Sequence, residues 1–187
     1  MARQIAPGIR TPLHTSLPTS PLDSQEINYL ADAANGIIWR LRYRAASASA
    51  YKWEYVGGAE ITAEVLAAET TTSTVYVDLA TAGPAIVAPL AGDYDIRGDC
   101  SISWGVSDTF GTCAVKVGSA GTTDNDRVAL TTGVIGASVG AGSQGGATIR
   151  RTVSAAATTI KLQYKNGNAN QVTYQYRRLG IRPVRVG

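Results

Sequence analysis

The clearest pattern in the sequence is an alternation of small or apolar side chains with polar ones along residues 93–104. The positions that share the apolar face are Tyr94, Ile96, Gly98, Cys100, Ile102 and Trp104. A period of two residues predicts a β-strand with one buried face. The next run turns Cys113, Val115 and Val117 inward. Pairing the two runs as a hairpin sets Cys100 opposite Cys113 and keeps every apolar side chain on one face.

Residues 25–58 predict a three-stranded antiparallel meander. Asn35-Gly36 lies between two β-prone runs and indicates a hairpin turn, because both residues readily take positive φ. The aromatic side chains then fall on one face and the arginines on the other. Three strands bury little surface alone, so we expect another domain or subunit to cover the aromatic face. The predicted interface side chains are Trp39, Tyr43, Trp53, Tyr55, Arg40 and Arg42.

Residues 59–187 predict a β-sandwich head with a jelly-roll-like arrangement. Several short runs alternate in polarity and are separated by Gly, Thr and Asn turns, which is typical of sandwiches. Ile160, Leu162 and Tyr164 form one such run, and a Gly-rich connection covers residues 133–146. In the last run the apolar phase switches near Arg177-Arg178, which predicts a β-bulge there. The fold class expected for the whole chain is therefore all-β.

Residues 1–24 have no hydrophobic period and predict an extended arm. Prolines recur along this segment, and each fixes its own φ and disfavours helix in the residue before it. We expect the arm to anchor the protein to a neighbour, with Pro7, Pro12, Leu13 and Pro18 as its contact residues.

Composition and charge narrow the range of functions. Gly occurs 20 times and Phe once, which suits a fold with many turns. The net charge of +3 is mild, and its arginines alternate with apolar residues along strands instead of forming a dense basic stripe, so we expect no nucleic-acid partner. No apolar run approaches the ~20 residues of a membrane span. Met1-Ala2-Arg3-Gln4 is not followed by the apolar segment of a signal peptide, so we expect synthesis in the cytoplasm.

The sequence offers little material for catalysis. Its single histidine, His14, falls in the proline-rich arm, and one His with two Cys leaves a zinc site short of ligands. Asp93, Asp95 and Asp99 share a strand face that is expected to be solvated. A glycosidase would need two carboxylates ~5–9 Å apart in a groove, for example between subunits. We predict no enzyme, no cofactor and no bound metal.

The two cysteines leave two alternatives open. A cross-strand disulfide fits the predicted pairing of Cys100 with Cys113. Synthesis in the cytoplasm favours reduced thiols that fill the core instead.

The segment from Met1 to Gly58 resembles a module found in structural proteins of tailed bacteriophages, notably those of actinobacteria. The resemblance rests on the run YLADAANGIIW at residues 29–39, followed by LRY at 41–43 and KWE at 52–54. The part of the chain after Gly58 resembles the β-sandwich heads of such proteins, and more broadly the trimeric jelly rolls of the tumour necrosis factor and C1q type. The first of these resemblances, from Met1 to Gly58, covers nearly a third of the chain.

This resemblance implies a virion component, made in the host cytoplasm and assembled as a homotrimer. Residues 1–24 would dock on other virion proteins, and the head would face the host, whose cell-surface glycans are candidate receptors. Asp108 and Phe110, in the loop after Trp104, are the candidate receptor-facing residues, whereas Trp104 itself is expected in the core. No long shaft separates arm and head, which favours a short tail fibre or tail-tip protein. The alternative is a capsid decoration protein or head fibre with a purely architectural role.

Overall fold

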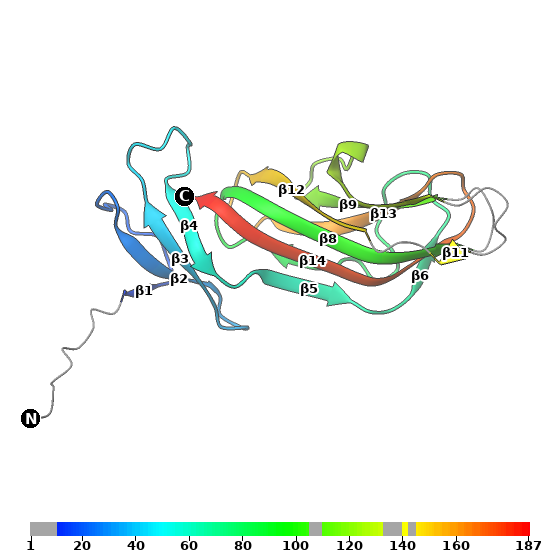
Figure 1. The fold of residues 1–187 in the computed structure, drawn as a ribbon, viewed down its shortest axis with the longest axis horizontal. Coiled ribbons are helices and arrows are strands. Elements are labelled where there is room, and N and C mark those ends of the chain that lie inside the picture. Colours follow the sequence, from blue (N-terminus) through cyan, green and yellow to red (C-terminus); the bar gives the residue numbers. More distant parts are fainter. Residues whose placement is uncertain (1–10, 105–109, 133–139, 142–144) are drawn as a thin grey trace, which may run out of the picture.

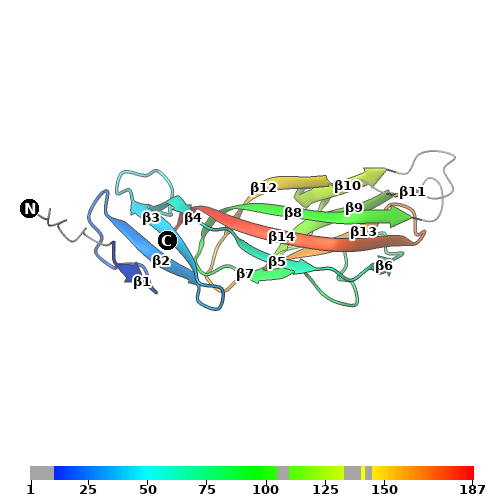
Figure 2. The same ribbon diagram turned by 60° about the horizontal axis from the view of Figure 1, so that its bottom comes forward.

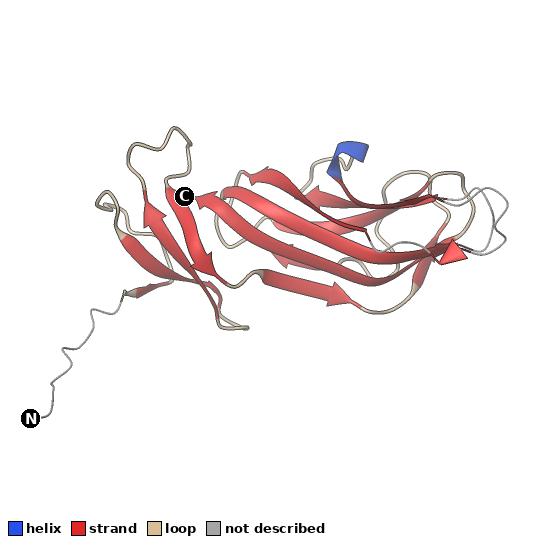
Figure 3. Ribbon diagram, in the orientation of Figure 1, coloured by secondary structure: helices blue, strands red, loops and turns tan. Residues whose placement is uncertain are grey.

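The computed structural model describes residues 11–104, 110–132, 140–141 and 145–187, and it confirms the all-β class (Figures 1 and 3). Within these residues the one helical element is the 3-10 helix η1 (Asp124–Asp126). The predicted Gly-rich connection at residues 133–146 lies mostly outside the described residues.

The strands form two sheets that face each other in the head. The larger sheet contains β1 (Leu13–His14), β2 (Glu26–Asp32), β3 (Ile37–Tyr43), β4 (Trp53–Gly58), β5 (Ile61–Val65), β6 (Glu69–Thr71), β8 (Gly92–Trp104), β11 (Gly140–Ala141), β12 (Gly145–Val153) and β14 (Val172–Val186). The smaller sheet has the order β10 (Arg127–Thr132), β9 (Phe110–Val117), β13 (Thr159–Asn166) and β7 (Ala85–Val87). The molecule is elongated, with β1–β4 forming a base at one end (Figures 1 and 2).

Strand β14 is the central strand of the larger sheet. One of its edges pairs with β8 along almost its whole length. Its other edge pairs successively with β6, β5 and the base strand β4. Base and head are therefore parts of one hydrogen-bonded sheet, and a single hydrophobic core runs through both.

The predicted β-bulge in the last strand is confirmed. The pairing of β14 with β8 shifts register between Gln175 and Arg178, and Tyr176 takes a φ of 51°. The bulge changes which side chains face the core, so that Tyr174 before it and Leu179 after it are both buried. It also turns Arg177 into the core, where that side chain is completely buried.

The predicted hairpin between residues 93–104 and 113–117 is wrong. The alternation itself is correct, since the apolar positions of β8 are buried along its whole length. However, β8 pairs with β12, β11 and β14, whereas β9 pairs with β10 and β13 in the other sheet. Two strands on facing sheets point their apolar side chains at the same core as a hairpin would. The alternation therefore fits both arrangements and does not distinguish them.

Gly98 lies at one point of closest approach between the sheets. A Cβ atom built on Gly98 would lie 2.6 Å from a methyl carbon of Val128 and 2.8 Å from one of Leu162. This position in β8 therefore has no space for a larger residue.

The two cysteines are free thiols on facing sheets. Cys100 in β8 and Cys113 in β9 are both completely buried. Burial, together with a hydrogen bond to Cys100, raises the pKa of the Cys113 thiol well above its ordinary value. A buried neutral thiol is a poor nucleophile, which favours the core-filling alternative.

We therefore expect neither thiol to react with Ellman's reagent in the folded protein at pH 8. After unfolding in guanidinium without a reductant, two thiols per chain should react. The absence of reactive thiols after unfolding would show instead that the cysteines form a disulfide.

The base has the predicted meander, with a wider turn than expected. Strands β2, β3 and β4 pair consecutively and antiparallel. The first turn comprises residues 33–36. Within it, the Asp32 carboxylate accepts hydrogen bonds from the backbone N–H groups of Ala34 and Asn35. Positive φ is needed at Gly36 (66°) but is not found at Asn35.

The arm also contributes a strand, which the sequence pattern did not predict. Leu13 and His14 form β1, which pairs in parallel with Asn28 and Tyr29 of β2 at the edge of the larger sheet. The Asn28 N–H donates to the Pro12 carbonyl, and its side-chain amide donates to Thr11. The described part of the arm is therefore fixed to the base.

Candidate binding surfaces

Two of the predicted interface aromatics are buried by the chain itself. Trp39 is completely buried, and Trp53 is 3% exposed. The Trp39 indole N–H donates to the Ala59 carbonyl, and its ring lies 6.2 Å from that of Tyr94 in β8. Of the two covers expected for this face, another domain or another subunit, the head supplies the first, through Tyr94 against Trp39.

Tyr43 and Tyr55 are half-buried at the margin of the same aromatic cluster. The Tyr43 ring lies 5.3 Å from that of Trp53, and Tyr55 meets Trp39 edge-on at 6.4 Å. The Tyr55 hydroxyl donates to the Gly58 carbonyl. Burial raises the pKa of Tyr55, although the charge of the nearby Arg182 acts to lower it. Their exposed edges are available to a partner, so an interface role remains a prediction for these two.

The predicted interface arginines lie on the opposite face of β3. Arg40 is exposed, and Arg42 forms an ion pair with Glu26 of β2 at 2.5 Å. The hydrogen bond from Arg42 lowers the pKa of the Glu26 carboxyl. This face is polar, and its role in oligomer contacts also remains a prediction.

The predicted anchoring residues are only partly described. Pro7 lies outside the described residues. Leu13 is 56% exposed on β1, Pro12 is also exposed, and Pro18 is half-buried. Leu22, on the same arm, is 77% exposed. The arm thus presents apolar side chains beside the base, which is compatible with anchoring but does not test it.

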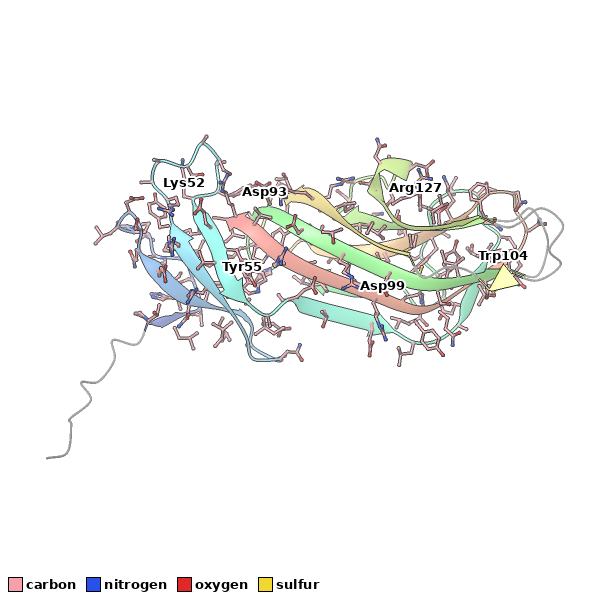
Figure 4. All side chains as sticks on the ribbon, viewed as in Figure 1. Lys52, Tyr55, Asp93, Asp99, Trp104 and Arg127 are labelled. Carbon is pink, nitrogen blue, oxygen red and sulfur yellow. The ribbon has the colours of Figure 1, made fainter. Side chains whose placement is uncertain are left out.

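The predicted receptor-facing loop is likewise only partly described. Asp108 lies outside the described residues. Phe110 is the first residue of β9, not part of the loop, and is 36% exposed. Its ring lies across the backbone of Gly167, where a Cβ atom would come within 2.0 Å of the ring. Trp104 is 6% exposed, as expected for a core residue. Figure 4 shows Trp104 at the end of the molecule opposite the base.

A groove on the outer face of the larger sheet escaped the sequence analysis. It consists of two adjoining depressions of about 400 and 330 Å³ that share Glu60 and Arg97. The first is lined by Glu60, Thr62, Ala63, Glu64, Arg97, Asp99, Arg178, Leu179 and Gly180. The second is lined by Tyr55, Gly58, Glu60, Asp95, Arg97, Thr148 and Arg182. The available signal was Gly180, a residue without a side chain in the middle of a strand.

Strand register explains how the groove is formed. Thr62 of β5, Gly180 of β14, Arg97 of β8 and Thr148 of β12 stand opposite one another in one cross-strand row. The row lacks a side chain at Gly180, whereas the neighbouring rows on the same outer face carry charged side chains. The depression is therefore built into the sheet by the sequence.

The aspartates considered for catalysis are engaged in polar contacts on this face. Asp95 forms ion pairs with Arg150 at 2.9 Å and Arg182 at 3.5 Å, Asp99 pairs with Arg97 at 3.5 Å, and Asp93 accepts a hydrogen bond from Thr152. Among the described residues, no group of three or more His, Cys, Asp or Glu side chains could hold a metal ion. Nor do these residues include a helix with the length and apolar character for crossing a membrane.

No protein-family model and no curated protein matches the chain. Among solved structures, it is similar to that of infectious bursal disease virus, Gx strain, with a TM-score of 0.41 and 12% identity, covering 76% of this chain and 37% of that chain. It is also similar to the VP2 subviral particle of the same virus, with a TM-score of 0.38 and 14% identity, covering 89% of this chain and 41% of that chain. The chain spans less than half the length of these virus proteins.

Proposed function

We propose that the chain is a structural component of a virion, assembled as a short trimeric tail fibre or tail-tip protein used in host attachment. The observation that carries the proposal is that both candidate attachment segments lie at the same end of the elongated molecule. The described part of the arm and the C-terminal strand end both lie at the base, since β1 pairs with β2, and Val186 of β14 pairs with Trp53 of β4 (Figure 1). The opposite end of the head is left free for a host surface.

The continuous sheet supports a load-bearing role. Strand β14 is hydrogen-bonded to β8 and to the base, and those bonds are perpendicular to the strands. The base joins β14 through the pairs Arg185 with Glu54 and Val186 with Trp53, so a load on the base passes into the long ladder of β14 with β8 in the head. The resemblance of residues 1–58 to a phage structural module supports the same function.

The first test is the mass of the full chain in solution by static light scattering. We expect three times the mass of one chain, and a stable monomer would contradict the trimeric fibre. A chain shortened by residues 1–24 should remain trimeric if the base and head drive assembly.

Location on the particle tests the rest of the proposal. Antibodies raised against residues 59–187 should label the tail tip of purified virions. Label spread over the capsid would favour the alternative of a decoration protein or head fibre. The absence of the chain from purified virions by mass spectrometry would refute both.

A further inference from the structure

We infer that the groove on the outer face of the larger sheet is a binding site for a neutral oligosaccharide. The groove crosses β4, β5, β14, β8 and β12 near the junction of base and head, and Figure 4 labels Tyr55 and Asp99, which line its two depressions. The proposed function puts the host-facing surface at the opposite end of the head, so a ligand site beside the base goes beyond it.

Glu60 is the central acceptor of the groove. A Cβ atom on Gly180 would lie 2.5 Å from the Glu60 carboxyl carbon and one of its oxygens, so this carboxylate lies directly over the bare backbone of β14. No ion pair joins Glu60 to a basic side chain among the described residues, although Arg97 lines both depressions beside it. Its oxygens are therefore positioned to accept hydrogen bonds from a ligand.

Arg97 and Arg182 supply donors on either side. Within the part of the chain that the structure describes, each forms one ion pair at 3.5 Å, with Asp99 and Asp95 respectively, and their side chains are 61% and 55% exposed. A guanidinium carries five N–H donors, so both retain donors that can turn to a ligand. Tyr55 adds a half-buried aromatic ring, a surface on which the apolar face of a sugar can pack.

Charge balance determines the class of ligand. The two depressions are lined by four carboxylates, from Glu60, Glu64, Asp95 and Asp99, and by three guanidinium groups, from Arg97, Arg178 and Arg182. This near balance gives neither an anion nor a cation a large advantage. A sugar hydroxyl both donates and accepts, so vicinal hydroxyls can satisfy a carboxylate and a guanidinium together. The combined volume is within the range of small-ligand sites.

The test measures binding of the full chain to neutral maltopentaose, laminaripentaose, mannopentaose and chitopentaose by isothermal titration calorimetry. At least one should bind, and Glu60→Gln and Arg97→Ala should each weaken that binding about ten- to a hundredfold, as expected for the loss of a hydrogen bond to a charged group. Tyr55→Phe should retain binding, because the ring remains. Glu26→Gln, at an ion-paired carboxylate outside the groove, is the matched control and should bind like the parent chain.

Circular dichroism and thermal melting establish that each variant is folded before its binding is compared. Failure of all four probes to bind at millimolar concentration would overturn the inference, as would binding that Glu60→Gln and Arg97→Ala leave unchanged. If anionic tetragalacturonic acid binds more strongly than the neutral probes, and this binding is lost on raising the salt concentration, the proposal of a neutral ligand is overturned. Self-association abolished by the same two variants would assign the groove to a second copy of the chain. None of these outcomes depends on whether the chain is found in virions.

Discussion

Replacing Glu69 by Ala is expected to lower the free energy of unfolding by about 3–5 kcal/mol at pH 7, because it leaves the buried Arg177 without its counter-charge. Arg177 is completely buried, and its Nη2 lies 3.4 Å from the Glu69 carboxylate. That carboxylate also accepts hydrogen bonds from the backbone N–H of Thr81 at 3.0 and 3.1 Å, while Arg177 donates to the Thr81 carbonyl at 3.1 Å. Urea denaturation of the two proteins measures the difference.

Glu64→Ala is the matched control for this prediction. Glu64 lies 3.4 Å from Arg178, the next residue of β14, but both side chains of that pair are more than half exposed. Exposed pairs contribute about 0–1 kcal/mol, so the control should lose little. Equal losses in the two variants would show that Arg177 finds other compensation. Replacing Glu69 and Arg177 together by Leu and Met should cost less than Glu69→Ala alone.

The same pair has a defined pH dependence. Burial by itself raises the pKa of Glu69, but the hydrogen bonds from Thr81 and the charge of Arg177 outweigh it, and the net pKa is lowered. A carboxyl whose pKa is lower in the folded chain stabilises the fold above its unfolded pKa and loses that contribution as the pH falls through its folded pKa. The stability difference between the parent chain and Glu69→Ala should therefore narrow as the medium is acidified below about pH 4.

Period-two alternation was sufficient to predict strands β8, β9 and β13 and their buried faces. Tyr94, Ile96, Ile160 and Leu162 are all buried as the pattern predicts. The same pattern could not assign strands to sheets, because facing sheets share one core and bury the same side chains as a hairpin. The wrong pairing of Cys100 with Cys113 in one sheet follows from that ambiguity.

Arg177 and Gly180 illustrate why the polar sites were harder to predict. The phase switch located the bulge, but an alternation of apolar residues does not show that the bulge turns an arginine inward. Its partner Glu69 is more than a hundred positions away in the sequence, so no local pattern connects them. The groove depends on the cross-strand row through Thr62, Gly180 and Arg97, which exists only once the strands are paired.

Replacing Trp39 by Ala is expected to lower the free energy of unfolding by about 3–5 kcal/mol, the usual cost of truncating a buried aromatic side chain. Trp39 belongs to the base, but its ring contacts Tyr94 of the head strand β8, and its N–H donates to Ala59 at the start of the head. The two parts share one core and one sheet, so base and head should unfold in a single transition. Tryptophan fluorescence and far-ultraviolet circular dichroism, followed through the same urea series, should therefore give coincident curves.

Ile38→Ala provides the control, because Ile38 is the next residue of β3, faces the opposite side and is 40% exposed. Its replacement should change the free energy of unfolding by no more than about 0.5 kcal/mol. Two separate transitions in the parent chain, with only the first affected by Trp39→Ala, would show that residues 25–58 unfold as a unit of their own. In that case the Trp39–Tyr94 contact would be a docking contact between two units. A single transition would show instead that base and head unfold as one cooperative unit.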